Sequence, residues 1–102
     1  MLGPKALMIV GVLHVKLRLH GCRSLKAKRS VVKGLLAKTE QRFRAAVAEV
    51  ADQDMHTSAS LGFCIVSGDS RHADQMLSSM QEFIASATPA EIVEMRREIL
   101  RL

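Results

Sequence analysis

The 102-residue sequence has few aromatic residues, few cysteines and no long apolar run. With three Phe and neither Trp nor Tyr, the sequence does not favour recognition of single-stranded nucleic acids by base stacking. Its two cysteines, Cys22 and Cys64, form neither a CxxC pair nor a disulfide framework, so we expect free thiols in a cytoplasmic protein. A membrane-spanning helix needs about 20 apolar residues, so we expect no membrane partner.

The sequence also lacks the residue patterns of common enzymes. It has no recognisable pair of carboxylates, no Ser/His/Asp arrangement and no glycine-rich phosphate-binding loop. Asp52, Asp54 and His56 resemble metal ligands, but no second cluster adds a His or Cys, and ordinary turn chemistry explains them better. We therefore predict no catalytic residue, no metal and no cofactor, and a protein that is not an enzyme.

Positive charge is concentrated in the N-terminal half. The whole chain has a net charge of +5. Residues 1–44 hold eleven Lys and Arg against the single acid Glu40, a net charge of +10, whereas residues 45–102 hold four against nine acids, a net charge of −5. This asymmetry indicates a molecule with one basic side, which permits an anionic partner without requiring one.

The hydrophobic pattern predicts an α+β domain. Alternation of apolar and polar residues indicates a strand over residues 9–19. Apolar residues at helical spacing predict a helix over residues 25–43, with Ser24 as its N-cap. The pattern then predicts, in order, a strand at 45–51, a strand at 59–67 and a second helix that ends near Ala87.

The last segment allows two interpretations. Thr88-Pro89-Ala90-Glu91 has the form of a capping box with Pro at the first helical position, which would begin a third helix. Rough alternation over residues 92–99 favours a strand instead, because two βαβ-like halves then complete one sheet with both helices on one face. We therefore predict a ferredoxin-like βαββαβ sandwich with a four-stranded antiparallel sheet and a central first strand.

Several segments of the chain resemble the bacterial YlxP-like family. They are MIVGVL at 8–13, SLKAKR at 24–29, AEVADQD at 48–54, and the strand that ends in SGD at 67–69. The resemblance implies a ferredoxin-like fold, no established reaction, and a gene often near those for translation initiation and ribosome maturation factors. Similar proteins begin near the equivalent of Met8, so we expect residues 1–7 to be a loosely ordered extension and residues 8–102 to be a single domain.

Basic residues near the start of the first predicted helix are the candidate anion-binding site. At about 100° per residue, Lys26, Arg29 and Lys33 share one flank of the helix. Cations are unfavourable at this positive end of the helix dipole, which favours a bound phosphate as compensation. The complete predicted nucleic-acid or anion site comprises Arg23, Lys26, Arg29, Lys33, Lys16 and Arg18. The alternative is a solvated basic face without a ligand.

Lys28 differs from these cations because it projects into the apolar stripe of the predicted helix, between Leu25 and Leu35. A lysine in that position can bury its aliphatic stem and extend its ammonium group to solvent. We therefore expect Lys28 to snorkel, and we prefer this interpretation to a catalytic amine.

Two functions fit the sequence best. The first is a non-enzymatic accessory protein that binds structured RNA or the ribosome through its basic face. The second is a homodimer joined by an apolar patch on the open face of the sheet, made of Val10, Val12, Cys64 and Val66. An enzyme acting on a phosphorylated small molecule ranks last, because only the cation cluster supports it.

Overall fold

The computed structural model describes residues 7–102, whose strands and helices follow the order βαββαβ. The elements are β1 (Ile9–Arg18), α1 (Leu25–Phe43), β2 (Ala46–Ala51), β3 (Ser58–Ser67), α2 (Ser70–Ala87) and β4 (Glu91–Arg101). The predicted loose extension over residues 1–7 falls, except for Leu7, outside the described residues.

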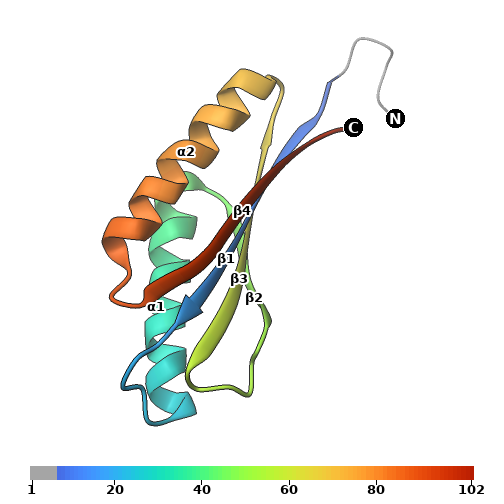
Figure 1. Ribbon diagram of the computed structural model, residues 1–102. Helices are drawn as coiled ribbons and strands as arrows, with labels where there is room; N and C mark the ends of the chain where they lie inside the picture. Colours follow the sequence, from blue (N-terminus) through green and yellow to red (C-terminus); the bar gives the residue numbers. More distant parts are fainter. Residues whose placement is uncertain (1–6) are drawn as a thin grey trace.

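All neighbouring strands are antiparallel, and the strand order in the sheet is β2-β3-β1-β4. Strand β1 is therefore central, and both helices cover the same face of the sheet (Figure 1). This is a ferredoxin-like sandwich, and the predicted fold class is confirmed. The other face of the sheet carries no helix of the described chain (Figure 1).

The terminal segment is a strand, which confirms the interpretation based on alternation. Strand β4 pairs with β1 from Ile9↔Arg101 to Arg18↔Glu91. The sequence that resembles a capping box ends α2 instead: the Thr88 N–H donates to the Ile84 carbonyl, and the Thr88 hydroxyl accepts from the Ala90 N–H. Thr88 and Pro89 thus close one helix and turn the chain into β4.

The core lies between the sheet and the two helices. Alternate residues of β1 point into it, and Leu13, Val15 and Leu17 are fully buried there. Strand β3 contributes Ala59, Leu61, Phe63 and Ile65, α1 contributes Val32 and Leu35, and α2 contributes Ala73, Leu77, Met80 and Ile84. Removal of this apolar surface from water is the main stabilising contribution to the fold.

Short side chains fix where the two helices begin. The Ser24 hydroxyl accepts a hydrogen bond from the Ala27 N–H at 3.1 Å, so Ser24 is the N-cap of α1 as predicted. The Asp69 carboxylate accepts from the Arg71 N–H at 2.9 Å and caps α2 in the same way. Each cap satisfies one of the N–H groups that a helix start leaves free.

Two glycines provide a test of backbone conformation. Gly34 lies within α1 with no heavy atom near the position of an added Cβ, so Gly34→Ala should raise the free energy of unfolding by about 1 kcal/mol. Gly21 has a φ of +73°, a conformation in which a side chain costs about 1–2 kcal/mol. Gly21→Ala should therefore lower the free energy of unfolding by that amount. Urea unfolding measures both. Effects of the same sign would contradict this account.

Candidate nucleic-acid interface

Four of the predicted cations lie just before α1 or in its N-terminal half. Arg23, Lys26, Arg29 and Lys33 are all exposed. Within residues 7–102, none of the four forms an ion pair with a carboxylate. The first turn of α1 holds no acidic residue either, so the positive end of the helix dipole and these side chains act in the same direction. We call these four residues the basic flank.

Lys16 and Arg18, the other two predicted cations, are on the opposite side of the sheet. They alternate with the buried residues of β1 and therefore lie on the open face. The register places Lys16 opposite Glu94 and Arg18 opposite Glu91, both on β4. The structure thus divides the six predicted cations into the basic flank and a pair beside carboxylates.

Glu91 illustrates the different electrostatics of that second group. Its Oε1 lies 2.5 Å from the His20 Nε2. This hydrogen bond, supported by the nearby charges of His20 and Arg18, lowers the pKa of the Glu91 carboxyl from its usual value. A carboxylate therefore stands beside Arg18 and reduces the positive potential at this end of β1.

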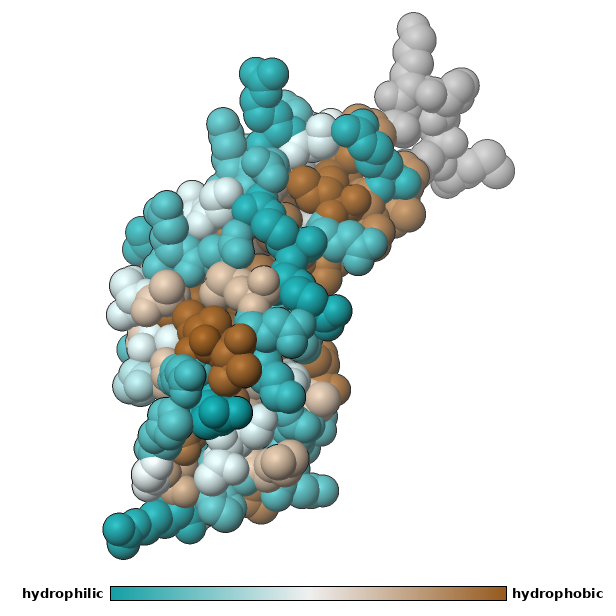
Figure 2. Space-filling view, viewed as in Figure 1, coloured by the Kyte–Doolittle hydropathy of each residue, from teal (hydrophilic) through white to brown (hydrophobic). Residues whose placement is uncertain are grey.

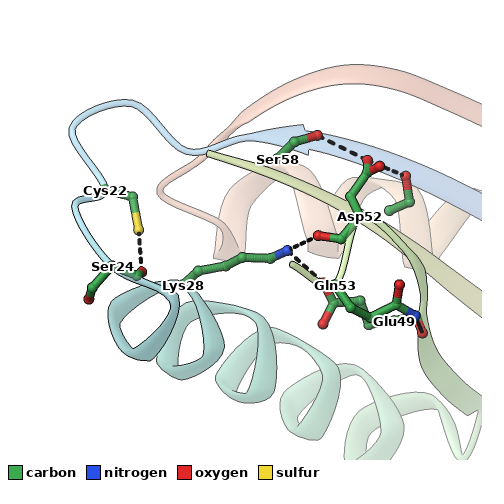
Figure 3. A network of polar contacts seen from close by, with 8 residues as sticks. Cys22, Ser24, Lys28, Glu49, Asp52, Gln53 and Ser58 are labelled. Atoms are coloured by element: carbon green, nitrogen blue, oxygen red, sulfur yellow. Dashed lines mark hydrogen bonds and ion pairs between the residues drawn. The ribbon is translucent and has the colours of Figure 1, made fainter. Parts of the chain in front are cut away.

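Lys28 does not snorkel, so that prediction is wrong. The whole residue is buried, with 0% of its surface exposed. Its Nζ donates to the Asp52 carbonyl at 2.5 Å and lies 2.8 Å from the Glu49 Oε2 (Figure 3). The ammonium group stays inside because β2 and the hairpin after it supply an anion and a carbonyl oxygen.

Asp52 shapes the hairpin that receives Lys28. Its φ of +63° is in the left-handed region, which Asp tolerates better than most residues. Its Oδ2 accepts from the hydroxyl of Ser58 at 3.1 Å (Figure 3). The same oxygen accepts from the hydroxyl of Ser60 at 3.2 Å. The carboxylate therefore holds the turn while the backbone carbonyl of the same residue binds the lysine, which agrees with the prediction of a turn residue.

Glu49 was not predicted as a functional residue, although the sequence carries a signal for it. Glu49 follows Val47 by two residues, so it points to the helix side of β2, where an acidic side chain needs a partner. Lys28 belongs to the SLKAKR segment, and Glu49 and Asp52 belong to the AEVADQD segment. Two of the four segments that carry the family resemblance therefore meet in one polar network.

The four predicted interface residues share the open face of the sheet. Val10 pairs with Val66, and Val12 pairs with Cys64. Strand β4 adds Leu100 beside Val10, a neighbour that the sequence analysis missed because it depends on the strand register. Val66 is 65% exposed and Leu100 is 37% exposed. Figure 2 shows hydrophobic surface at this end of the molecule, where β1 begins and β4 ends.

Residues 10–97 match a known family, described as "Protein of unknown function (DUF503)". The chain belongs to the DUF503 family. The predicted membership in a family of unknown function is thus confirmed, whereas the YlxP-like name stays a prediction. No curated protein matches the sequence. No helix in residues 7–102 is long and apolar enough to cross a membrane.

Solved structures resemble this DUF503 chain in fold. The de novo designed protein Foldit4 is 12% identical, with a TM-score of 0.52 over 89% of this chain and 96% of that one. SO0527 from Shewanella oneidensis is 16% identical, with a TM-score of 0.49 over 93% and 90%. A dimeric ferredoxin-like protein from an uncultured marine organism is 6% identical, with a TM-score of 0.41 over 96% and 90%. At these identities the likeness concerns the fold alone.

The buried pair of Lys28 and Glu49 can be tested by a double-mutant cycle. Glu49→Leu leaves the buried ammonium without its carboxylate and should lower the free energy of unfolding by about 3 kcal/mol. Lys28→Met with Glu49→Leu removes both charges and should restore a large part of that loss. Urea unfolding of both single variants and of the double variant measures the coupling. Strict additivity would show that the two side chains do not interact.

Proposed function

We propose that this DUF503 protein is a non-enzymatic accessory factor that binds structured RNA, such as ribosomal RNA, through the basic flank. The observation that carries the proposal is that Arg23, Lys26, Arg29 and Lys33 are exposed without an ion-pair partner among residues 7–102. Arg23 and Lys26 lie at the positive end of a 19-residue helix, and Arg29 and Lys33 follow in its N-terminal half. Such an arrangement attracts phosphate groups.

The spacing of these cations suits a nucleic-acid backbone. Lys26 and Lys33 are seven residues apart, about 10 Å along the helix axis, and Arg29 lies between them. Side chains spread over that length can contact more than one phosphate of the same strand. Contacts of this kind position a protein on RNA without reading its sequence.

The sheet favours structured RNA over unpaired bases. Domains that bind single-stranded RNA on a four-stranded sheet stack bases on aromatic side chains of its open face. Here the open face of β1 carries Val10, Val12, His14, Lys16 and Arg18. The resemblance to the YlxP-like family, whose genes often lie near those for ribosome maturation factors, supports ribosomal RNA as the structured target.

Neutralisation of the basic flank is the direct test. Lys26→Gln, Arg29→Gln and Lys33→Gln together should reduce affinity for purified ribosomal RNA at least tenfold at low salt. The slope of log affinity against log salt should become shallower by about two to three, about one for each phosphate that the variant no longer neutralises. Filter binding over a range of salt concentrations measures both quantities.

The matched control for this test is Arg71→Gln with Arg96→Gln and Arg101→Gln. It removes the same charge from exposed positions on α2 and β4 and should bind nearly as tightly as the parent. Exposed substitutions usually change stability by about 0.5 kcal/mol or less, so both triple variants should fold. A folded flank variant that binds RNA as tightly as the parent would rule out the basic flank as the site.

A homodimer joined through the open face is the second candidate function. The observation in its favour is the apolar row of Leu100, Val10 and Val66, which no helix covers in residues 7–102. Contiguous apolar surface of this kind often marks an interface. Such a dimer is compatible with RNA binding, because the basic flank lies on the helix side of the sheet.

Sedimentation equilibrium tests this second candidate. The parent should form dimers at high protein concentration, and Val66→Lys should raise the dimer dissociation constant at least tenfold, because a buried lysine needs a partner. Lys38→Gln, at an exposed position on α1, serves as a control and should leave the dissociation constant unchanged. A parent that stays monomeric at the highest concentration would eliminate this candidate.

A further inference from the structure

The two edges of the sheet differ in their protection against pairing with another strand. Edge strand β4 carries the charged residues Glu91, Glu94, Arg96, Arg97, Glu98 and Arg101. It also has a register shift at Val93, opposite Lys16 and Leu17. Figure 2 shows hydrophilic side chains along β4. Charges and bulges at an edge discourage the addition of a further strand.

Edge strand β2 has much weaker protection. Glu49 is its only charged residue, and that carboxylate points inward to the buried Lys28. A register shift follows Glu49, so Ala46–Glu49 form a regular stretch. Within residues 7–102, no strand pairs with the outer side of β2. This edge therefore presents backbone N–H and C=O groups that an extended chain can pair with.

A groove of about 450 Å³ runs between α1 and this edge. Its apolar lining comes from Val32 and Leu36 of α1 and from Val47 of β2. Arg29 and Lys33 line it as well, and neither is ion-paired among residues 7–102. A strand added to β2 would direct every second side chain to the helix side, where this groove lies.

We propose that the β2 edge and this groove bind an extended, acidic segment of a partner protein. The backbone of the segment pairs with Ala46–Glu49 as an additional strand. Apolar side chains of the segment contact Val32, Leu36 and Val47, and its carboxylates pair with Arg29 and Lys33. The site also includes Glu40 and Glu49, but the Glu49 carboxylate is already paired with Lys28, so the unpaired charge beside the groove is mainly positive.

Charge decides between this occupant and a second copy of the chain. Two copies joined antiparallel through β2 would place their α1 helices side by side on one face of an extended sheet. Arg29 and Lys33 of each copy would then approach the same basic side of the other, which is unfavourable. RNA fits less well, since its backbone has no N–H groups to pair with a strand edge and no apolar side chains for the groove.

The site overlaps the basic flank only in part. Arg29 and Lys33 line the groove, whereas Arg23 and Lys26 do not. The inference does not rest on RNA binding, because a protein that bound no RNA would keep the same strand edge and groove. Variants that separate these two pairs of cations can therefore distinguish the failure of one proposal from the failure of the other.

Synthetic peptides and the ¹⁵N-labelled full chain provide the test. The probe is the hexapeptide Glu-Thr-Val-Thr-Glu-Thr, as long as the six-residue β2, whose two Glu and one Val share one face of the strand and can all point to the groove. The comparison peptide has Lys in place of each Glu. The acidic peptide should shift the amide resonances of β2 and slow hydrogen exchange there, and it should bind at least tenfold more tightly than the basic peptide. A version of the acidic peptide with all of its backbone amides N-methylated keeps its charges but can donate no backbone hydrogen bond to β2, and it should bind at least tenfold more weakly.

Charge-reversal variants of the protein provide a second test of the proposal. Arg29→Glu with Lys33→Glu should reverse the preference, so that the basic peptide binds more tightly than the acidic one. Arg23→Glu with Lys26→Glu makes the same change in net charge outside the groove and should retain the preference for the acidic peptide. The ¹⁵N spectra of both variants report whether each is folded, and the N-methylated peptide tests the proposal without any change to the protein.

Several results would overturn the proposal. Equal binding of the N-methylated and unmodified acidic peptides would exclude strand addition. Protection of β2 that depends on protein concentration and needs no peptide would identify a second copy as the occupant. An RNA hairpin that shifts the groove resonances when neither peptide does would identify RNA instead.

Discussion

The buried ammonium group of Lys28 is the constraint on which the arrangement of α1 depends. A charge with no exposed surface requires nearby partners, and these are the Glu49 carboxylate and the Asp52 carbonyl. Both partners belong to β2 and the hairpin that follows it. The contact therefore sets the rotation of α1 about its own axis. Once Lys28 points to the sheet, the helical period turns Lys26, Arg29 and Lys33 away from it.

Much of the fold could be predicted from local pattern. Alternation identified β1, helical spacing identified α1, and Ser24 marked the start of that helix. The sequence also placed Lys28 in the apolar stripe of the helix, but it did not show which groups its ammonium would contact. Its partners lie more than twenty residues away, and only the folded chain brings a carboxylate and a backbone carbonyl to the same point.

The sequence predicted the candidate site correctly only for residues whose placement depends on a single helix or strand. The basic flank needs no more than the helical period, whereas the surroundings of Lys16 and Arg18 depend on which strand pairs with β1 and in which register. That pairing places Glu94 and Glu91 beside them, on the face opposite α1. The groove beside β2 could not be predicted either, because its prediction requires the identity of the edge strand and the direction of the Glu49 side chain.

The strand order also determines how the chain can assemble. Lys28 and Asp52 are 24 residues apart, whereas Ile9 pairs with Arg101, across almost the whole chain. Because the entropy lost on closing a loop grows with its length, α1 and the β2–β3 hairpin can associate before β4 docks. During synthesis from the N-terminus, the edge of β1 that pairs with β4 stays unpaired until β4 emerges. Strand β4 is the last of these four strands to be made, and it shields a central strand of the sheet from aggregation.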